Sequence, residues 1–145
     1  MKKLLLDVDE LNEDFFGDTR LLGITATVKN YQFCMQLNNI LGYDFRLNPE
    51  IEIHLKKKNR NYYFSIYQYN EPNTPLIHYL YQNQFDGEYL LPEFKHMDFL
   101  WLMKYDLVDD EKCSWIRQAI RNLNGVQMIT ELTNEQIKNK GNMVF

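Results

Sequence analysis

Hydrophobic residues recur at every second position in several segments of the chain, which is the pattern of half-buried β-strands. Leu4, Leu6 and Val8 form a first short alternation, and residues 21–28 form a second one. In the second segment the even positions carry aliphatic side chains, and the odd positions from Gly23 onward carry glycine and threonine. The pattern therefore predicts two short strands before the first helix.

Residues 30–41 change to a helical period, with apolar side chains three and four positions apart. The expected buried stripe consists of Phe33, Cys34, Leu37, Ile40 and Leu41. Asn30 stands where it would cap the start of this helix, and Gly42 stands where it would close the end. We expect an amphipathic helix over this range.

A second amphipathic pattern begins at Asp109 or Asp110, either of which would serve as the N-cap, and it ends at Gly125. Its expected buried stripe consists of Cys113, Ile116, Ala119, Ile120 and Leu123. The two helices of the chain are thus predicted to present one apolar side each, which must pack against another element.

Residues 126–132 predict a strand after the second helix. Directly beyond it, Thr133 and Gln136 have the spacing of a capping box, and Leu132 and Ile137 have that of a hydrophobic staple. We therefore expect a short helix near the C-terminal end.

The middle of the chain predicts several neighbouring strands that pair in antiparallel fashion. Three strand patterns are joined by loops too short for a crossover helix, and they cover residues 51–57, 61–69 and 76–82. Residues 97–105 carry large apolar side chains at both odd and even positions, which is typical of a strand covered on both sides. We expect this last strand at the centre of the sheet.

The order of these elements predicts an α+β fold with two main helices packed on one face of an antiparallel sheet. A helix crossover occurs near each end of the chain, as in the ferredoxin-like plan, and the remaining segments would add strands to it. No stretch rich in proline, glycine or serine divides the chain, so residues 1–145 are expected to form a single domain.

Composition limits the classes of partner. The formal net charge is −4, so the molecule as a whole is expected to repel nucleic acid and anionic membranes. No apolar run approaches the roughly 18 residues of a membrane helix. The apolar run that starts at Leu4 ends at Asp7, too early for a secretory signal. Cys34 and Cys113 fall on the apolar stripes of the helices, which favours buried thiols and a cytoplasmic location.

Residues 91–99 combine two carboxylates and an imidazole at the start of the most apolar strand. This segment resembles the motif of the bacterial IPExxxVDY family. Pro92, Glu93 and Asp98 match that motif, and close substitutes stand at its Ile, Val and Tyr positions, namely Leu91, Met97 and Phe99. The surrounding order of elements is similar to the family's over nearly the whole chain. The family is uncharacterised, so the resemblance implies a bacterial cytoplasmic domain without a defined activity.

Two interpretations of this segment follow from its residues. Glu93, His96 and Asp98 would form an acid–base or ligand-binding cluster in an enzyme or small-ligand binder, or they would fix the loop and the strand. Asp98 is expected beside the apolar strand, where an ionised carboxylate needs a partner or a raised pKa. His96 falls in the unspecified part of the motif.

Other catalytic and metal-binding signatures are absent from the sequence. His54 and His78 are expected to be exposed strand residues, and no histidine or cysteine pair has metal-ligand spacing, so we expect no metal and no cofactor. No Gly-x-Ser-x-Gly elbow and no phosphate-binding glycine loop is present. The sequence does not decide whether the protein is an enzyme, but this pattern favours a non-catalytic one.

Residues 56–60 form a basic run beside several tyrosines, and basic groups next to strand-borne aromatic rings are one way to hold single-stranded nucleic acid. The alternative is a solvated hairpin turn whose charges discourage edge aggregation. Nucleic-acid binding through Lys56 to Arg60 is therefore retained as a secondary hypothesis.

Tyr63, Tyr67 and Tyr69 share one side of a predicted strand, and the other side also carries large apolar residues. An uncovered aromatic sheet face would be a partner surface, whereas a covered one would belong to the core. Our leading hypothesis is a non-catalytic binding or interaction domain that self-associates through this face.

Overall fold

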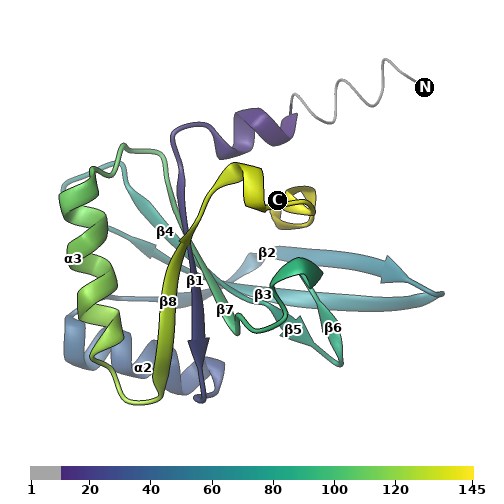
Figure 1. Ribbon diagram of the computed structural model, residues 1–145, viewed down its shortest axis with the longest axis horizontal. Helices are drawn as coiled ribbons and strands as arrows, with labels where there is room; N and C mark the ends of the chain where they lie inside the picture. Colours follow the sequence, from purple (N-terminus) through teal and green to yellow (C-terminus); the bar gives the residue numbers. More distant parts are fainter. Residues whose placement is uncertain (1–10) are drawn as a thin grey trace.

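The computed structural model of the protein describes residues 11–145. The strand predicted at residues 4–8 lies outside this range. Residues 11–16 are helical, and the chain then enters the main sheet (Figure 1). No helix among the described residues is long and apolar enough to span a membrane.

Six strands form one sheet in the order β2-β3-β4-β7-β1-β8, and all neighbouring strands run antiparallel. Their bounds are β1 Arg20–Ala26, β2 Arg46–Lys57, β3 Arg60–Asn70, β4 Ile77–Gln82, β7 Phe99–Lys104 and β8 Val126–Leu132. A separate short hairpin consists of β5 Gln84–Phe85 and β6 Glu88–Tyr89. Every residue of β7 is buried, which confirms the prediction that this strand lies at the centre.

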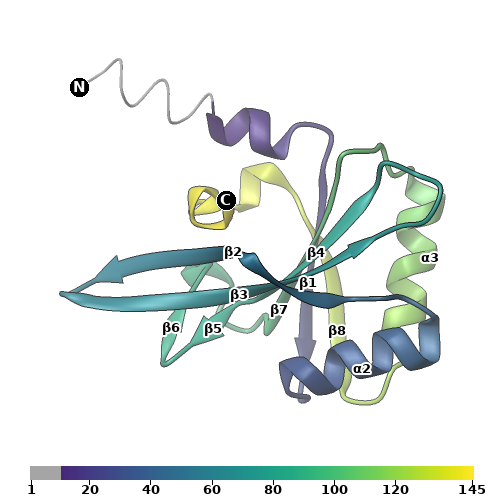
Figure 2. The same ribbon diagram turned by 180° about the vertical axis from the view of Figure 1, so that it is seen from behind.

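Two helices, α2 (Asn30–Leu41) and α3 (Asp110–Arg121), cover one face of the sheet (Figure 2). Strands β7 and β8 both run antiparallel to β1, so they are parallel to each other and α3 crosses between them. Helix α2 makes the equivalent crossover after β1. The α+β class and the ferredoxin-like plan with additional strands are confirmed.

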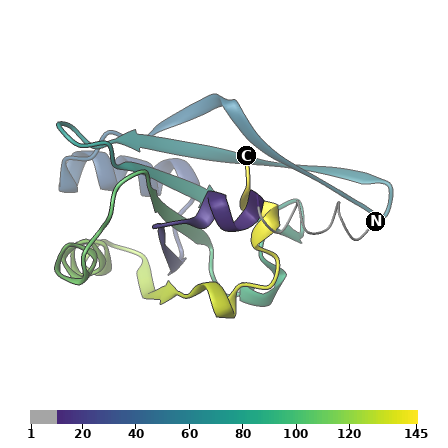
Figure 3. The ribbon, with the colours of Figure 1, turned by 90° about the horizontal axis from the view of Figure 1, so that it is seen from above.

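The opposite face of the sheet is covered by the two ends of the described chain, as Figure 3 shows. Phe16 from the N-terminal helical segment and Ile137 and Met143 from the C-terminal segment are buried there. They pack with residues that point to this face from β3 and β7, including Phe64 and Leu100. The sheet is therefore the middle layer between two hydrophobic cores.

The ends of α2 agree with the predicted range but not with the predicted cap. Lys29 is the N-cap residue, and its backbone N–H donates to Gln32 Oε1 at 3.3 Å. Asn30 is already helical, and its side chain donates to Gln82 Oε1 instead. Gly42 closes the helix with a φ of 74°, a conformation that glycine adopts without a steric penalty.

Of the caps predicted further along the chain, the two N-terminal ones are present, whereas the prediction that the second helix ends at Gly125 is wrong, because α3 (Asp110–Arg121) ends earlier with Asn122 as its C-cap. Asp109 Oδ1 accepts a hydrogen bond from the Lys112 backbone N–H at 2.7 Å and begins α3. The Thr133 backbone N–H donates to Gln136 Oε1 at 2.9 Å, as in a capping box. The expected short helix is only a 3-10 turn, η2 (Asn134–Gln136). The turn ends there because Ile137 is extended and is buried in the core that also contains Phe16 and Met143.

The first residues of two strands differ from those predicted by two positions or more. β7 begins at Phe99 rather than at residue 97, because the preceding residues form the 3-10 turn η1 (Pro92–Phe94) and a further turn. β2 begins earlier, at Arg46, and runs through Pro49 with a break in its pairing to β3. The β2–β3 hairpin extends beyond the helices and closes in a tight turn.

Candidate functional site

A buried asparagine organises the segment that resembles the IPExxxVDY motif. Asn83 has no exposed surface, and its Oδ1 accepts a hydrogen bond from the Leu91 backbone N–H at 2.8 Å. Its Nδ2 donates to the carbonyl oxygens of Phe94 and Met97, each at 2.9 Å. The motif segment is therefore a loop folded around one amide side chain, which sequence analysis did not single out.

Glu93 connects this loop to the C-terminal segment. Its Oε2 accepts hydrogen bonds from the backbone N–H groups of Lys138 at 2.6 Å and Asn139 at 2.8 Å, and its Oε1 accepts one from Asn139 Nδ2 at 2.8 Å. Partial burial by itself would raise the pKa of Glu93, but these hydrogen bonds outweigh it and hold the pKa below its ordinary value. An ionised Glu93 thus anchors the chain end on the sheet.

Asp98 has the partner that its position demanded. Its Oδ2 accepts a hydrogen bond from the Ala26 backbone N–H at 2.9 Å, and its own N–H donates to the Ile24 carbonyl at 2.7 Å. The Asp98 carboxylate therefore extends the hydrogen bonding between β7 and β1 beyond the first residue of β7. The Asp98 side chain itself is exposed, although we expected it to lie beside the buried residues of the apolar strand.

The three candidate acid–base groups do not share a site. Glu93 faces the C-terminal segment, Asp98 faces β1, and the His96 side chain is exposed while its carbonyl accepts from Thr25 Oγ1 at 2.7 Å. Within residues 11–145, no group of three or more His, Cys, Asp or Glu side chains is placed to hold a metal ion. The arrangement ties separate parts of the chain together.

The prediction that His78 is exposed is wrong, whereas His54 is exposed as expected. His78 has no exposed surface, because β4 lies inside the sheet and α2, α3 and the segment before β2 cover this face. Its Nδ1 accepts from Trp101 Nε1 at 3.0 Å, and its Nε2 lies 3.4 Å from Glu71 Oε1. Burial lowers the pKa of His78 to about 4, although Glu71 opposes this shift. It is a neutral core residue without access to a substrate.

The predicted tyrosine surface is largely inside the molecule. Tyr69 is buried and Tyr67 is half-buried, and both pack against the core beneath the helices. Tyr63 lies further out on the hairpin, is 45% exposed, and stacks on His54 with ring centroids 4.8 Å apart. Of the three tyrosines, only Tyr63 is left to contact a partner.

Two side chains of the basic run already have acidic partners. Lys57 Nζ lies 2.9 Å from Glu88 Oε1, and Arg60 Nη2 lies 3.1 Å from Asp86 Oδ2. Both acids belong to the β5–β6 hairpin, which lies beside the tip of β2–β3 (Figure 2). The negative charges of these two acids weaken the attraction of the β2–β3 hairpin for phosphate groups.

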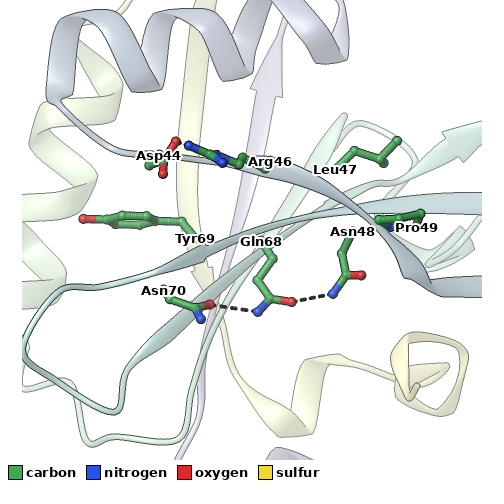
Figure 4. Close-up of a pocket in the computed structure, with 8 residues that line it drawn as sticks. All are labelled: Asp44, Arg46, Leu47, Asn48, Pro49, Gln68, Tyr69 and Asn70. Atoms are coloured by element: carbon green, nitrogen blue, oxygen red, sulfur yellow. Dashed lines mark hydrogen bonds and ion pairs between the residues drawn. The ribbon is translucent and has the colours of Figure 1, made fainter.

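A shallow polar hollow of about 380 Å³ lies where β2 separates from β3 (Figure 4). Its amide side chains form a chain of hydrogen bonds, from Asn48 Nδ2 to Gln68 Oε1 and from Gln68 Nε2 to Asn70 Oδ1, each 2.8 Å long. Arg46 is paired with Asp44 at 3.0 Å. These polar groups satisfy one another, so the hollow shows no convergent reactive groups.

The outer side of α2 is the most unusual surface among the described residues. None of the 12 residues of this helix is charged, and three large apolar side chains are exposed: Tyr31 by 53%, Met35 by 57% and Ile40 by 64%. We call this side of the helix the α2 surface; it consists of Tyr31, Gln32, Met35, Gln36, Asn39 and Ile40.

Ile40 was expected on the buried stripe of α2, and that prediction is wrong. The stripe that packs on the sheet is centred on Cys34 and Leu37, so Ile40 lies at its edge and near the end of the helix. A shallow hollow of about 510 Å³ extends along this surface. Within the described chain, the buried Oε1 atom of Gln36 has no hydrogen-bond donor.

No protein-family model matches the sequence, and no curated protein matches it either. The resemblance to the IPExxxVDY family therefore stays a prediction based on the residues of its motif.

Proposed function

We propose that this protein is a non-catalytic interaction domain that binds a second copy of itself through the α2 surface. The observation that carries this proposal is the absence of charge from α2 in a chain that is 25% charged, in which a helix of 12 residues would carry about three charges on average. The cores of protein interfaces are depleted in charged residues and enriched in aromatic residues and methionine. The α2 surface has this composition.

A second copy suits this surface because neutral amide side chains both donate and accept hydrogen bonds. Two α2 surfaces related by a two-fold axis would present the same groups to each other without like-charge repulsion, although each molecule has a net charge of −4. The surface is thus complementary to itself.

The α2 surface replaces the aromatic sheet face as the place of self-association. Tyr69 is buried and Tyr67 is half-buried against the same core, so the two rings do not form a free aromatic face for a partner. Neither alternative function gains support from the geometry, because Glu93, His96 and Asp98 are engaged separately and two cations of the basic run are paired.

We also infer that the protein works in a reducing compartment such as the bacterial cytoplasm. Cys34 and Cys113 are both free and buried. Burial raises the pKa of the Cys34 thiol to about 12, so this group stays protonated and unreactive at neutral pH.

Sedimentation velocity over a wide concentration range tests the proposal. The wild-type protein is expected to associate, and Met35→Lys is expected to weaken association at least tenfold, because it places one charge from each copy at the contact. Gln118→Lys is the matched control, since it adds the same charge at an exposed position of α3. A wild-type protein that stays monomeric, or a Met35→Lys variant that associates like the control, would refute the proposal.

A further inference from the structure

The two edges of the six-stranded sheet are protected very differently. β2 forms one edge, and it contains Pro49 and a break in its pairing between Leu47 and Glu52. It also ends in Lys56 and Lys57. Proline, irregular pairing and lysine are the features by which natural sheets prevent another strand from adding to an edge. The β2 edge is therefore closed to pairing.

β8 forms the other edge and contains neither proline nor lysine. Its pairing with β1 shifts by one residue near its start, where Thr25 faces Met128 and Ala26 faces Val126, and is regular from Met128 to Leu132. It pairs with β1 on one side, and no strand within residues 11–145 pairs with its outer side. Figure 1 shows β8 in the foreground, with no helix or strand drawn in front of it. Residues 126–130 contain neither proline nor charge. Their backbone groups on this side are thus available to another strand.

The β8 strand is also held firmly in place. Ile129 and Leu132 are buried in the two cores on opposite faces of the sheet, whereas Met128 is 39% exposed. The charge of Glu131 is bound by Arg20, whose Nε and Nη2 each donate a 2.8 Å hydrogen bond to the carboxylate. The edge is therefore an ordered and nearly neutral strand. Because β8 is already ordered in the folded protein, pairing with another strand costs little further conformational entropy.

We propose that β8 pairs antiparallel with β8 of a second copy, so that the two sheets continue into one another. An antiparallel edge is self-complementary, because a two-fold rotation brings its N–H groups opposite its own carbonyl groups. With the axis at Met128, Glu131 would face Gly125 of the other copy; with the axis at Ile129, it would face Gln127. Neither arrangement places like charges opposite each other.

This inference extends the proposed self-association to a second surface, separate from α2 in the sequence and in the fold. Each contact is two-fold symmetric, so each can form without the other. A wild-type protein that makes both contacts assembles beyond a dimer. A protein that makes only one of them stops at a dimer.

Single and double variants distinguish the two contacts by the mass of the assembly, measured by sedimentation and light scattering. Met128→Lys is expected to remove the β8 contact, because in either arrangement it places two ammonium groups on the same side of the paired strands close to the axis. Met35→Lys is expected to remove the α2 contact. We expect assemblies above a dimer for the wild type, dimers for each single variant and a monomer for the double variant. Met128→Leu should behave as the wild type does.

An unchanged mass for Met128→Lys would overturn the β8 proposal and leave the α2 proposal standing. An unchanged mass for Met35→Lys would do the reverse. Hydrogen exchange of the wild-type protein gives an independent readout, since backbone N–H groups of β8 should become more protected as concentration rises while those of β7 do not change. Equal exchange in β8 at low and high concentration would also overturn the β8 proposal.

Discussion

Trp101 and His78 are joined by a hydrogen bond between two side chains that have no exposed surface. The indole Nε1–H donates to His78 Nδ1 at 3.0 Å, so the imidazole proton lies on Nε2 and points to Glu71 Oε1. Lys112 completes the group from α3, with its Nζ 2.7 Å from Glu71 Oε2. Polar contacts thereby connect the buried centre of the sheet, through the partly buried Glu71, to α3 at the surface.

Stability should depend on pH through His78. Its folded pKa is lowered to about 4, so below an ordinary histidine pKa of about 6.5 the unfolded chain binds a proton that the folded chain does not. The free energy of unfolding should therefore fall between about pH 6.5 and pH 4, by up to roughly 3 kcal/mol from this residue. Urea unfolding of the wild type and of His78→Gln measures it. Parallel pH curves for the two proteins would contradict the prediction.

Asn83→Ala should destabilise the fold by about 3 kcal/mol. The change leaves the Leu91 N–H group and the carbonyls of Phe94 and Met97 without their partner in a buried position. Thermal or urea unfolding measures the loss. Gln84→Ala, at the exposed next position, is the control and should change stability by less than about 0.5 kcal/mol. Equal effects of the two substitutions would show that Asn83 does not organise the loop.

Glu93→Gln should loosen the C-terminal segment at a cost of about 1–2 kcal/mol, because it removes charge-assisted hydrogen bonds to Lys138 and Asn139. Hydrogen exchange of residues 137–145 reports this directly. Since the pKa of Glu93 is lowered in the folded protein, Glu93 contributes fully to the free energy of unfolding above the ordinary glutamate pKa. This contribution is lost as the pH falls through the lowered pKa. The variant should lack this pH dependence, and Glu135→Gln, an exposed change nearby, should retain it.

Gly23 should tolerate no side chain without a rearrangement of Met97. A Cβ atom at this position would lie 2.9 Å from Met97 Sδ and 3.2 Å from Leu132 Cδ1. Gly23→Ala is expected to cost about 1–2 kcal/mol through overpacking. The cost should shrink when Met97→Ala is added, which a double-mutant cycle measures as a favourable coupling. Additive effects would mean that the two residues do not compete for this space.

Much of the architecture could be predicted because it depends on short-range pattern. The ranges 30–41 and 126–132 match α2 and β8, and the apolar run on both sides of β7 identified the central strand. Helix period, strand alternation and cap spacing each concern residues only a few positions apart. The order of such elements was then sufficient to predict the ferredoxin-like plan.

The environment of individual side chains could not be predicted in the same way. His78 alternates with apolar residues in β4, but alternation says only which side of a strand a residue occupies and not whether that side is covered. The burial of Tyr69 and the partial burial of Tyr67 could not be predicted for the same reason, because the elements that cover them come from elsewhere in the chain. Ile40 is the opposite case, because this apolar residue was expected to be buried but lies exposed at the edge of the buried stripe of α2.

The sequence by itself determined the fold class, most of the secondary structure and the centres of the two buried stripes. Only the tertiary structure decided that Glu93 holds Lys138 and Asn139, and that β2 and β8 are the two edges of the sheet. The physical reason is distance along the chain. Hydrogen bonds between residues 45 and 46 positions apart, and the position of a strand within a sheet, exist only after the chain has folded.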